Sequence, residues 1–338
     1  MNLNVLEKSV LATIAYYDTM DYPLTGFEVF KYLINPLHII ELLGMSFSEG
    51  IEPMGKIELL DVLKILQNNN LKFYIQETNG FFYLKNREDI YELRIERQKI
   101  SDQMWKKSRK IIKWLQIIPY IKMVLMSGSM AMYNARKESD IDLLIVTKNK
   151  RIWTTRFLTT LFFQIIGQRR HKEKIANRFC LNHYIANNSL KINLFSLYTA
   201  HLYVHLVPIL ELEQGIYNRF QFENRWIGNY LYFYDLQKLD NQQKTKNSKI
   251  LEFVRKFQEF ILNTFVGIIL EKILRFFQIK HIKNHPLLNQ KGGRIIFNDQ
   301  QLEFHPESPE LKILDKYNKN MLQLNLRIKE HDSGLSSL

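Results

Sequence analysis

The strongest constraint in the sequence is a pair of aspartates at the head of an apolar run, Asp140-Ile-Asp142-Leu-Leu-Ile-Val-Thr147. The run has the length and composition of a buried β-strand. Side chains two residues apart on a strand point to the same face, so both carboxylates project together. Carboxylates held that close repel each other unless a cation lies between them, and Mg²⁺ suits such a pair. We therefore predict that Asp140 and Asp142 bind metal and carry the chemistry.

A second motif lies just upstream of this strand. Lys122 to Met126 form a short apolar strand, and Gly128-Ser129 follow it at the start of a helical-looking stretch. That position offers backbone N–H groups, a helix N-terminus and a hydroxyl to a phosphate group. A phosphate-binding turn facing a carboxylate pair is what metal-assisted transfer of a phosphoryl or nucleotidyl group requires.

Together the two motifs resemble a known family. Gly-Ser, ten intervening residues and Asp-x-Asp entering an apolar strand are similar to the signature of the nucleotidyltransferase superfamily, which includes DNA polymerase β and poly(A) polymerases. The resemblance covers about residues 119–190. Strands alternate with helices there, which favours an α/β core. The resemblance implies an α+β chain whose polymerase-beta-like core is a mixed sheet with flanking helices.

The resemblance also implies an activity. Members of the superfamily transfer a nucleoside monophosphate from an NTP to a hydroxyl acceptor and release pyrophosphate, using two Mg²⁺ ions. By this resemblance Gly128 and Ser129 would bind the triphosphate, while Asp140 and Asp142 would be metal ligands and catalytic residues. The acceptor stays open between a small molecule, a protein and a nucleic acid.

The chain departs from the family at the third carboxylate. The next strand, from Arg178 to Ile185, contains no acid, and Asn182 is the nearest isostere of an aspartate. Its amide oxygen can bind Mg²⁺ but brings no negative charge. The longer stretch from Arg178 to Pro208 resembles bacterial proteins that join a winged helix to this fold. Either the missing acid is supplied elsewhere or not needed, or the chain is a degenerate member that acts as a nucleic-acid-binding or nucleotide-sensing regulator.

Charge favours an anionic partner. The formal net charge is +13 and the pI is about 9.5, which suits nucleic acid, nucleotide phosphates or an anionic membrane face. Residues 148–178 carry nine Lys or Arg against one acid. Within them we predict that Arg156 contacts phosphate, with a solvated basic surface as the alternative. Glu211 and Glu213 are candidates for the general base that a small-molecule acceptor would need.

Helix and turn signals divide the chain into four parts. Residues 1–86 read as three helices and a hairpin at Asn79-Gly80, the order of a winged helix, with a small cap or a dimerisation unit as alternatives. We expect a connecting helix over 87–118, the nucleotidyltransferase core over 119–215 and a mainly helical C-terminal domain over 216–338. In that last part, residues 249–283 are amphipathic, which fits core packing, a partner helix or an interfacial membrane helix.

The remaining sequence features mostly exclude particular sites or segments. Cys180 is the single cysteine, which excludes an intramolecular disulfide, and its apolar strand predicts a core position. The pair His201 and His205 lacks a nearby third ligand, so we expect no metal site there. The N-terminus has no basic-then-apolar signal layout, and no apolar run reaches the roughly 18 residues of a membrane span. We expect a cytoplasmic protein.

Overall fold

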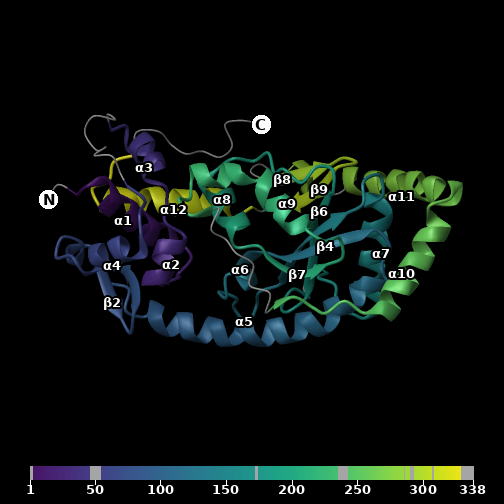
Figure 1. Cartoon of the computed structure of the whole chain (residues 1–338), viewed down its shortest axis with the longest axis horizontal. Helices are drawn as coiled ribbons and strands as arrows, with labels where there is room; N and C mark the ends of the chain where they lie inside the picture. Colours follow the sequence, from purple (N-terminus) through teal and green to yellow (C-terminus); the bar gives the residue numbers. More distant parts are fainter. Residues whose placement is uncertain are drawn as a thin grey trace.

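A six-stranded mixed sheet forms the centre of the fold (Figure 1). The computed structural model describes residues 3–45, 55–171, 174–234, 243–284, 286–289, 293–306 and 308–328. The strands lie in the order β7-β4-β5-β6-β9-β8. Their bounds are β4 Ile121–Met126, β5 Ile141–Thr147, β6 Phe179–Ala186, β7 Val207–Glu211, β8 Arg294–Phe297 and β9 Gln301–His305. Strands β5 and β6 are parallel and the other neighbours antiparallel, so the α+β class and the mixed sheet are confirmed.

Both faces of the sheet are covered, which is why β5 is apolar from Leu143 to Val146. Leu143 and Ile145 pack into one hydrophobic cluster with helix α5 (Ile90–Ile112) and helix α7 (Ile152–Ile165). Leu144 and Val146, on the other face, belong to a cluster that continues into the N-terminal helices. The sheet and the N-terminal part therefore share one core.

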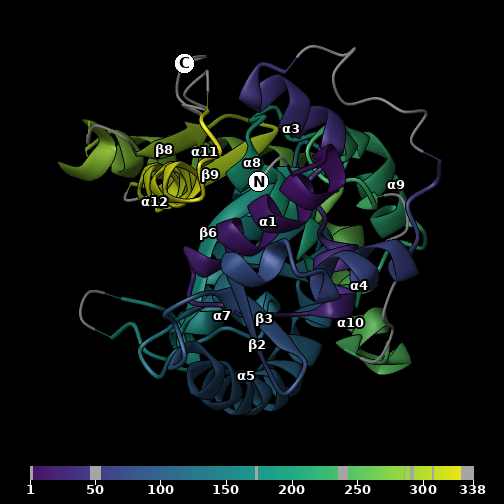
Figure 2. The ribbon, with the colours of Figure 1, turned by 90° about the vertical axis from the view of Figure 1, so that its left-hand side faces the viewer.

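The N-terminal part combines four helices with a small sheet (Figure 2). The helices are α1 (Val5–Asp18), α2 (Gly26–Lys31), α3 (Pro36–Leu43) and α4 (Leu59–Gln67), and the strands are β1 (Leu24–Thr25), β2 (Ile75–Thr78) and β3 (Phe81–Leu84). Strand β3 lies between β1 and β2. Thr25 caps α2, since its side-chain hydroxyl accepts from the N–H of Glu28. The hairpin is confirmed, with positive φ at Asn79 and Gly80.

Helix α5 runs beneath both parts (Figure 1). It is shorter than the predicted connector over 87–118, because a 3₁₀ segment (Lys113–Ile117) follows it. Trp105, on its buried side, donates from the indole N–H to the carbonyl of Met130 at 3.2 Å. The helix thus supports helix α6 (Gly128–Ala131), which is a single turn.

The C-terminal part is not a separate helical domain. Strand β9 pairs with β6, and helix α12 (Glu310–Gln323) packs against α1 and helix α8 (Leu197–Val204). The boundary expected at residue 216 therefore divides a continuous sheet. Between these segments lie helix α9 (Ile216–Glu223), helix α10 (Lys249–Leu262) and helix α11 (Phe265–Lys283). No helix in the described ranges has the length and hydropathy to cross a membrane.

A substitution of Glu271 tests how α11 is attached to the core. Its buried carboxylate accepts from the backbone N–H groups of Trp153 and Thr154, at 2.9 Å each, and so caps α7. We expect Glu271→Ala to lower the free energy of unfolding by about 2–4 kcal/mol, because two buried N–H groups lose their acceptor. Urea unfolding followed by circular dichroism measures it. Glu252→Ala, on the solvent side of α10, should leave the free energy of unfolding nearly unchanged, and equal losses would contradict this role.

Candidate active site

A cavity of about 460 Å³ lies where three distant parts of the chain meet. Helix α1 contributes Tyr16, the sheet contributes the two aspartates, and the C-terminal part contributes His305 and Ile313. Of the six predicted site residues, five line this cavity: Gly128, Ser129, Asp140, Asp142 and Asn182. The volume is in the range of ordinary small-molecule sites.

The turn after β4 is built against Asp142. Gly128 has φ +65, and a Cβ placed there would lie 2.5 Å from a carboxylate oxygen of Asp142. Ser127 donates its N–H to the Asp142 carbonyl at 3.0 Å. Only glycine combines this backbone angle with this close approach. Because α6 is a single turn, the phosphate-binding potential lies in the N–H groups and hydroxyls of the turn more than in a helix dipole.

The two aspartates differ in their surroundings. Asp140 directly precedes β5 and forms an ion pair with Arg170 at 2.7 Å. Asp142 lies on the strand, where burial and the charge of Asp140 raise the pKa of its carboxyl to about 7, against the opposing effect of Arg170. The two carboxylates therefore repel each other, as the sequence predicts.

Strand β6 supplies the neighbours of this pair. Cys180 lies opposite Asp142 in the strand register and is buried, as predicted, and burial raises the pKa of its thiol. Its sulfur and the oxygens of Asp140 and Asp142 lie within 4.8 Å of one another. Two residues further along β6, the side-chain amide nitrogen of Asn182 lies 3.2 Å from Nδ1 of His305. With that nitrogen engaged, the amide oxygen is the atom it can offer a ligand.

Arg156 does not reach the cavity, so its predicted phosphate contact needs correction. It lies on α7, where its guanidinium donates to Gln278 at 2.6 Å and lies 4.9 Å from the ring centroid of Phe304. Helix α7 packs against α11 and β6, and the arginine belongs to that contact. Charge along the sequence could not show which way the helix turns this side chain.

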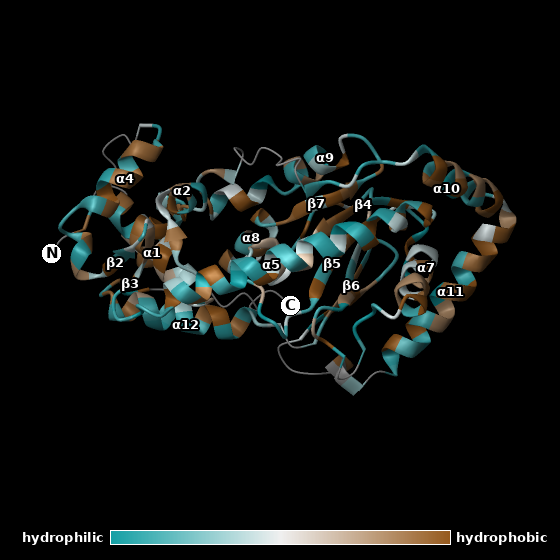
Figure 3. Ribbon diagram, turned by 90° about the horizontal axis from the view of Figure 1, so that it is seen from below, coloured by the Kyte–Doolittle hydropathy of each residue, from teal (hydrophilic) through white to brown (hydrophobic). Residues whose placement is uncertain are grey.

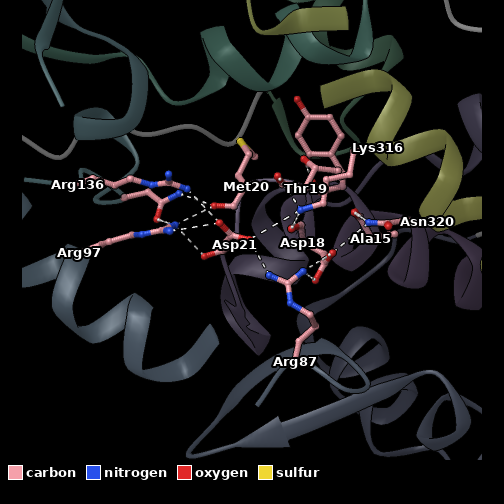
Figure 4. A network of polar contacts seen from close by, with 12 residues as sticks. Ala15, Asp18, Thr19, Met20, Asp21, Arg87, Arg97, Arg136, Lys316 and Asn320 are labelled. Atoms are coloured by element: carbon pink, nitrogen blue, oxygen red, sulfur yellow. Dashed lines mark hydrogen bonds and ion pairs between the residues drawn. The ribbon is translucent and has the colours of Figure 1, made fainter. Parts of the chain in front are cut away.

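Four arginines line the cavity, none of which the sequence singled out as a ligand: Arg97, Arg136, Arg170 and Arg294. Figure 4 shows Arg97 and Arg136 converging on Asp21 after helix α1. Arg97 also donates to the carbonyl of Met20 and to Asn134, both at 3.0 Å. This network joins the N-terminal part to the loop between Ser129 and Asp140.

Comparison with known proteins agrees with this geometry. Residues 109–183 match the family model described as polymerase beta, nucleotidyltransferase. This match supports placing the core of the chain in the nucleotidyltransferase superfamily. No curated protein and no solved structure gave a significant match to the chain.

Among the residues that the structure describes, Asp140 and Asp142 are the only acids that line the cavity. Glu303 on β9 lies opposite His183 of β6, and its oxygens come within 3.8 Å of His183 and 3.7 Å of His305. Glu303 is fully buried and forms a 2.6 Å ion pair with Arg294, which neutralises it. It does not line the cavity and so does not replace the missing carboxylate.

The other sequence candidates have structural partners. His201 and His205 are buried, and their ring nitrogens lie 3.1 and 2.7 Å from the Tyr17 hydroxyl. Glu211 pairs with Lys244 and Glu213 with Lys122, and neither lines the nucleotidyltransferase cavity. Of the nine basic residues over 148–178, Lys172 lies outside the described residues.

The raised pKa of Asp142 gives a stability test. The folded state binds the Asp142 proton more tightly than the unfolded state, so wild-type stability falls as pH rises towards and through 7. We expect Asp142→Asn to raise the Tm by several degrees at pH 8 in EDTA, and the gain to shrink as pH falls to 5. Differential scanning calorimetry measures it. Asp102→Asn, an exposed control, should leave the Tm unchanged, and a gain for Asp142→Asn that does not vary with pH would contradict this cause.

Proposed function

We propose that the chain transfers a nucleoside monophosphate from an NTP to a hydroxyl acceptor and releases pyrophosphate. The observation that carries this is the convergence of the Gly128-Ser129 turn and both aspartates on one cavity within the nucleotidyltransferase domain. Family membership supports nucleotidyl transfer as the class of reaction, and the cavity supplies the groups that such a reaction uses.

The charge of the cavity walls fits a polyphosphate. Four arginines and two aspartates line it, and Arg97 and Arg136 also pair with Asp21, as Arg294 does with Glu303. Arginine binds phosphate oxygens in a bidentate manner. We assign phosphate binding to the Ser127–Ser129 turn, with Arg136 and Arg170 as the exposed cations beside it.

The donor set fits Mg²⁺. Asp140 and Asp142 offer hard carboxylate oxygens, and Asn182 offers an amide oxygen on the same cavity wall. The Cys180 thiol stays protonated because its pKa is raised, so it does not compete as a soft ligand. A divalent cation held there would neutralise the aspartate pair and polarise the phosphate oxygens.

The acceptor would bind towards the N-terminal and C-terminal walls. Tyr16 and Met20 line the cavity on one side, and Pro309 and Ile313 line it on another. These side chains exclude water and present apolar surface around the reacting groups. We therefore expect the acceptor hydroxyl to belong to a molecule with an apolar or aromatic portion.

Calorimetry of Mg²⁺-NTP binding is the first test. We expect micromolar binding by the wild type and a loss of at least about 100-fold in Asp140→Ala/Asp142→Ala, because the cation that bridges protein and phosphates loses its ligands. The matched control is Asp102→Ala/Asp315→Ala, two exposed aspartates outside the cavity. Unchanged binding in the site variant would sink the proposal.

With the same protein, an assay of pyrophosphate release distinguishes an active enzyme from a degenerate one. Binding together with pyrophosphate release in the presence of hydroxyl compounds supports transfer. Binding without pyrophosphate release across a broad acceptor panel favours the nucleotide-sensing alternative, in which the absent third carboxylate removes the chemistry.

A nucleic-acid-binding role is the second candidate, carried by a basic loop beside the site. Arg169, Arg170, Lys174 and Arg178 are exposed or half-buried, and Arg170 is paired with Asp140. We also propose that residues 1–86 form a winged helix, which the element order and the position of β3 between β1 and β2 support.

Salt dependence tests that role. We expect fluorescently labelled DNA or RNA to bind at low salt and to weaken at least about tenfold between 50 and 200 mM salt, as phosphate contacts require. Arg169→Glu/Lys174→Glu should abolish binding if the loop is the contact. Lys72→Glu/Lys85→Glu, exposed changes beside the hairpin, should abolish it if the winged helix is the contact. Binding that neither pair alters would reject both surfaces.

A further inference from the structure

Helix α10 presents its apolar stripe to solvent instead of to the core. Ile250, Phe253, Val254, Phe257, Phe260 and Ile261 recur at spacings of three and four, so they share one face of the helix. All six are exposed, and Phe253 and Phe260 keep 72% and 76% of their surface. An ordinary surface helix turns this face inward.

Helix α11 continues the pattern. Phe265, Val266, Ile269, Ile273, Phe276 and Phe277 are all exposed on it. Taking about 200 Å² for one phenylalanine, the six exposed phenylalanines of the two helices leave on the order of 800 Å² in water. The largest apolar patch on a typical monomer is roughly 300–600 Å². We call these exposed side chains of α10 and α11 the outer face.

The inner sides of both helices are firmly held. Arg151 donates to the carbonyls of Leu262 and Gly267, where α10 passes into α11. Glu259 accepts from the N–H of Tyr120 at 2.8 Å, and Glu271 caps α7 as described above. The outer face is therefore a fixed surface on a packed scaffold. Figure 3 shows α10 and α11, in alternating brown and teal, at the end of the molecule away from the N-terminal part.

Positive charge borders the outer face. Residues 249–284 contain seven Lys or Arg and three acids. Lys256 lies one turn from Phe253 and Phe260, and Lys280 lies one turn from Phe276 and Phe277. Glu259 and Glu271 are turned towards the core, and the exposed Glu252 is paired with Lys256. The boundary of the outer face is thus positively charged.

We propose that the outer face binds the surface of an anionic lipid bilayer, with both helices lying in the interface. Exposed phenylalanine and isoleucine bordered by lysine is the composition of interfacial helices, where rings enter the acyl boundary and ammonium groups meet lipid phosphates. The charge complementarity selects an anionic bilayer over a second copy of this positively charged chain. This inference is independent of the nucleotidyl-transfer proposal.

Vesicle co-sedimentation of the full chain tests it. The vesicles are phosphatidylcholine with phosphatidylglycerol at about one third, and pure phosphatidylcholine for comparison. We expect binding to the anionic vesicles, and a loss of about 100-fold or more in Phe253→Ser/Phe257→Ser/Phe260→Ser, because three rings no longer leave water. Lys272→Glu/Lys280→Glu should weaken binding at least about tenfold, through lost attraction to the lipid phosphates.

The matched control is Phe27→Ser/Phe73→Ser/Phe222→Ser, three exposed phenylalanines on other elements, with exposures of 58%, 63% and 65%. It should bind like the wild type, and circular dichroism should show every variant folded. Failure of the wild type to bind anionic vesicles overturns the proposal, as does an equal loss in the control. A dimer in light scattering that only the α10 variant dissociates, without vesicle binding, would assign the outer face to a second copy.

Discussion

Repulsion between two carboxylates at the start of β5 is the constraint around which this structure is arranged. Asp142 is half-buried beside Asp140, and its pKa rises to about 7 through loss of solvent and the charge of Asp140. An ion pair with Arg170 partly offsets the repulsion at Asp140. Gly128 has no Cβ, which leaves space for the Asp142 carboxylate. Such a pair is unfavourable for stability alone, and buried strain of this kind is concentrated at functional sites.

The sheet brings residues from distant parts of the chain together to form the cavity. Strand β6 brings Asn182 beside β5, and β9 brings His305 to Asn182 from over a hundred residues away. From the other side, Asp21 binds Arg97 and Arg136 and so fixes the N-terminal part to α5 and to the loop between α6 and β5 (Figure 4). In the proposed function, the region matched by the nucleotidyltransferase family model would supply the chemistry, and the flanking parts would supply the walls that select the acceptor.

The outer face of α10 and α11 lies at the opposite end of the molecule from the N-terminal part (Figure 1). An interfacial position there would hold the chain at a membrane surface without a spanning helix. The two helices are attached to the core by Arg151, which directly precedes α7, and by Glu271 of α11. The membrane contact and the site would then be carried by one rigid scaffold.

The sequence by itself determined where the candidate site residues lie and much of the local structure. Asp140, Asp142 and Gly128-Ser129 could be placed because their spacing and strand context are local, and the hairpin at Asn79-Gly80 followed from turn residues that tolerate positive φ. Only the tertiary structure decided the rest. Arg156 turned towards Gln278, Arg294 and His305 reached the cavity through pairing of β9 with β6, and the stripe of α10 faced outward. Each depends on which elements pack together, and periodicity gives the face of a helix or strand without giving its neighbour.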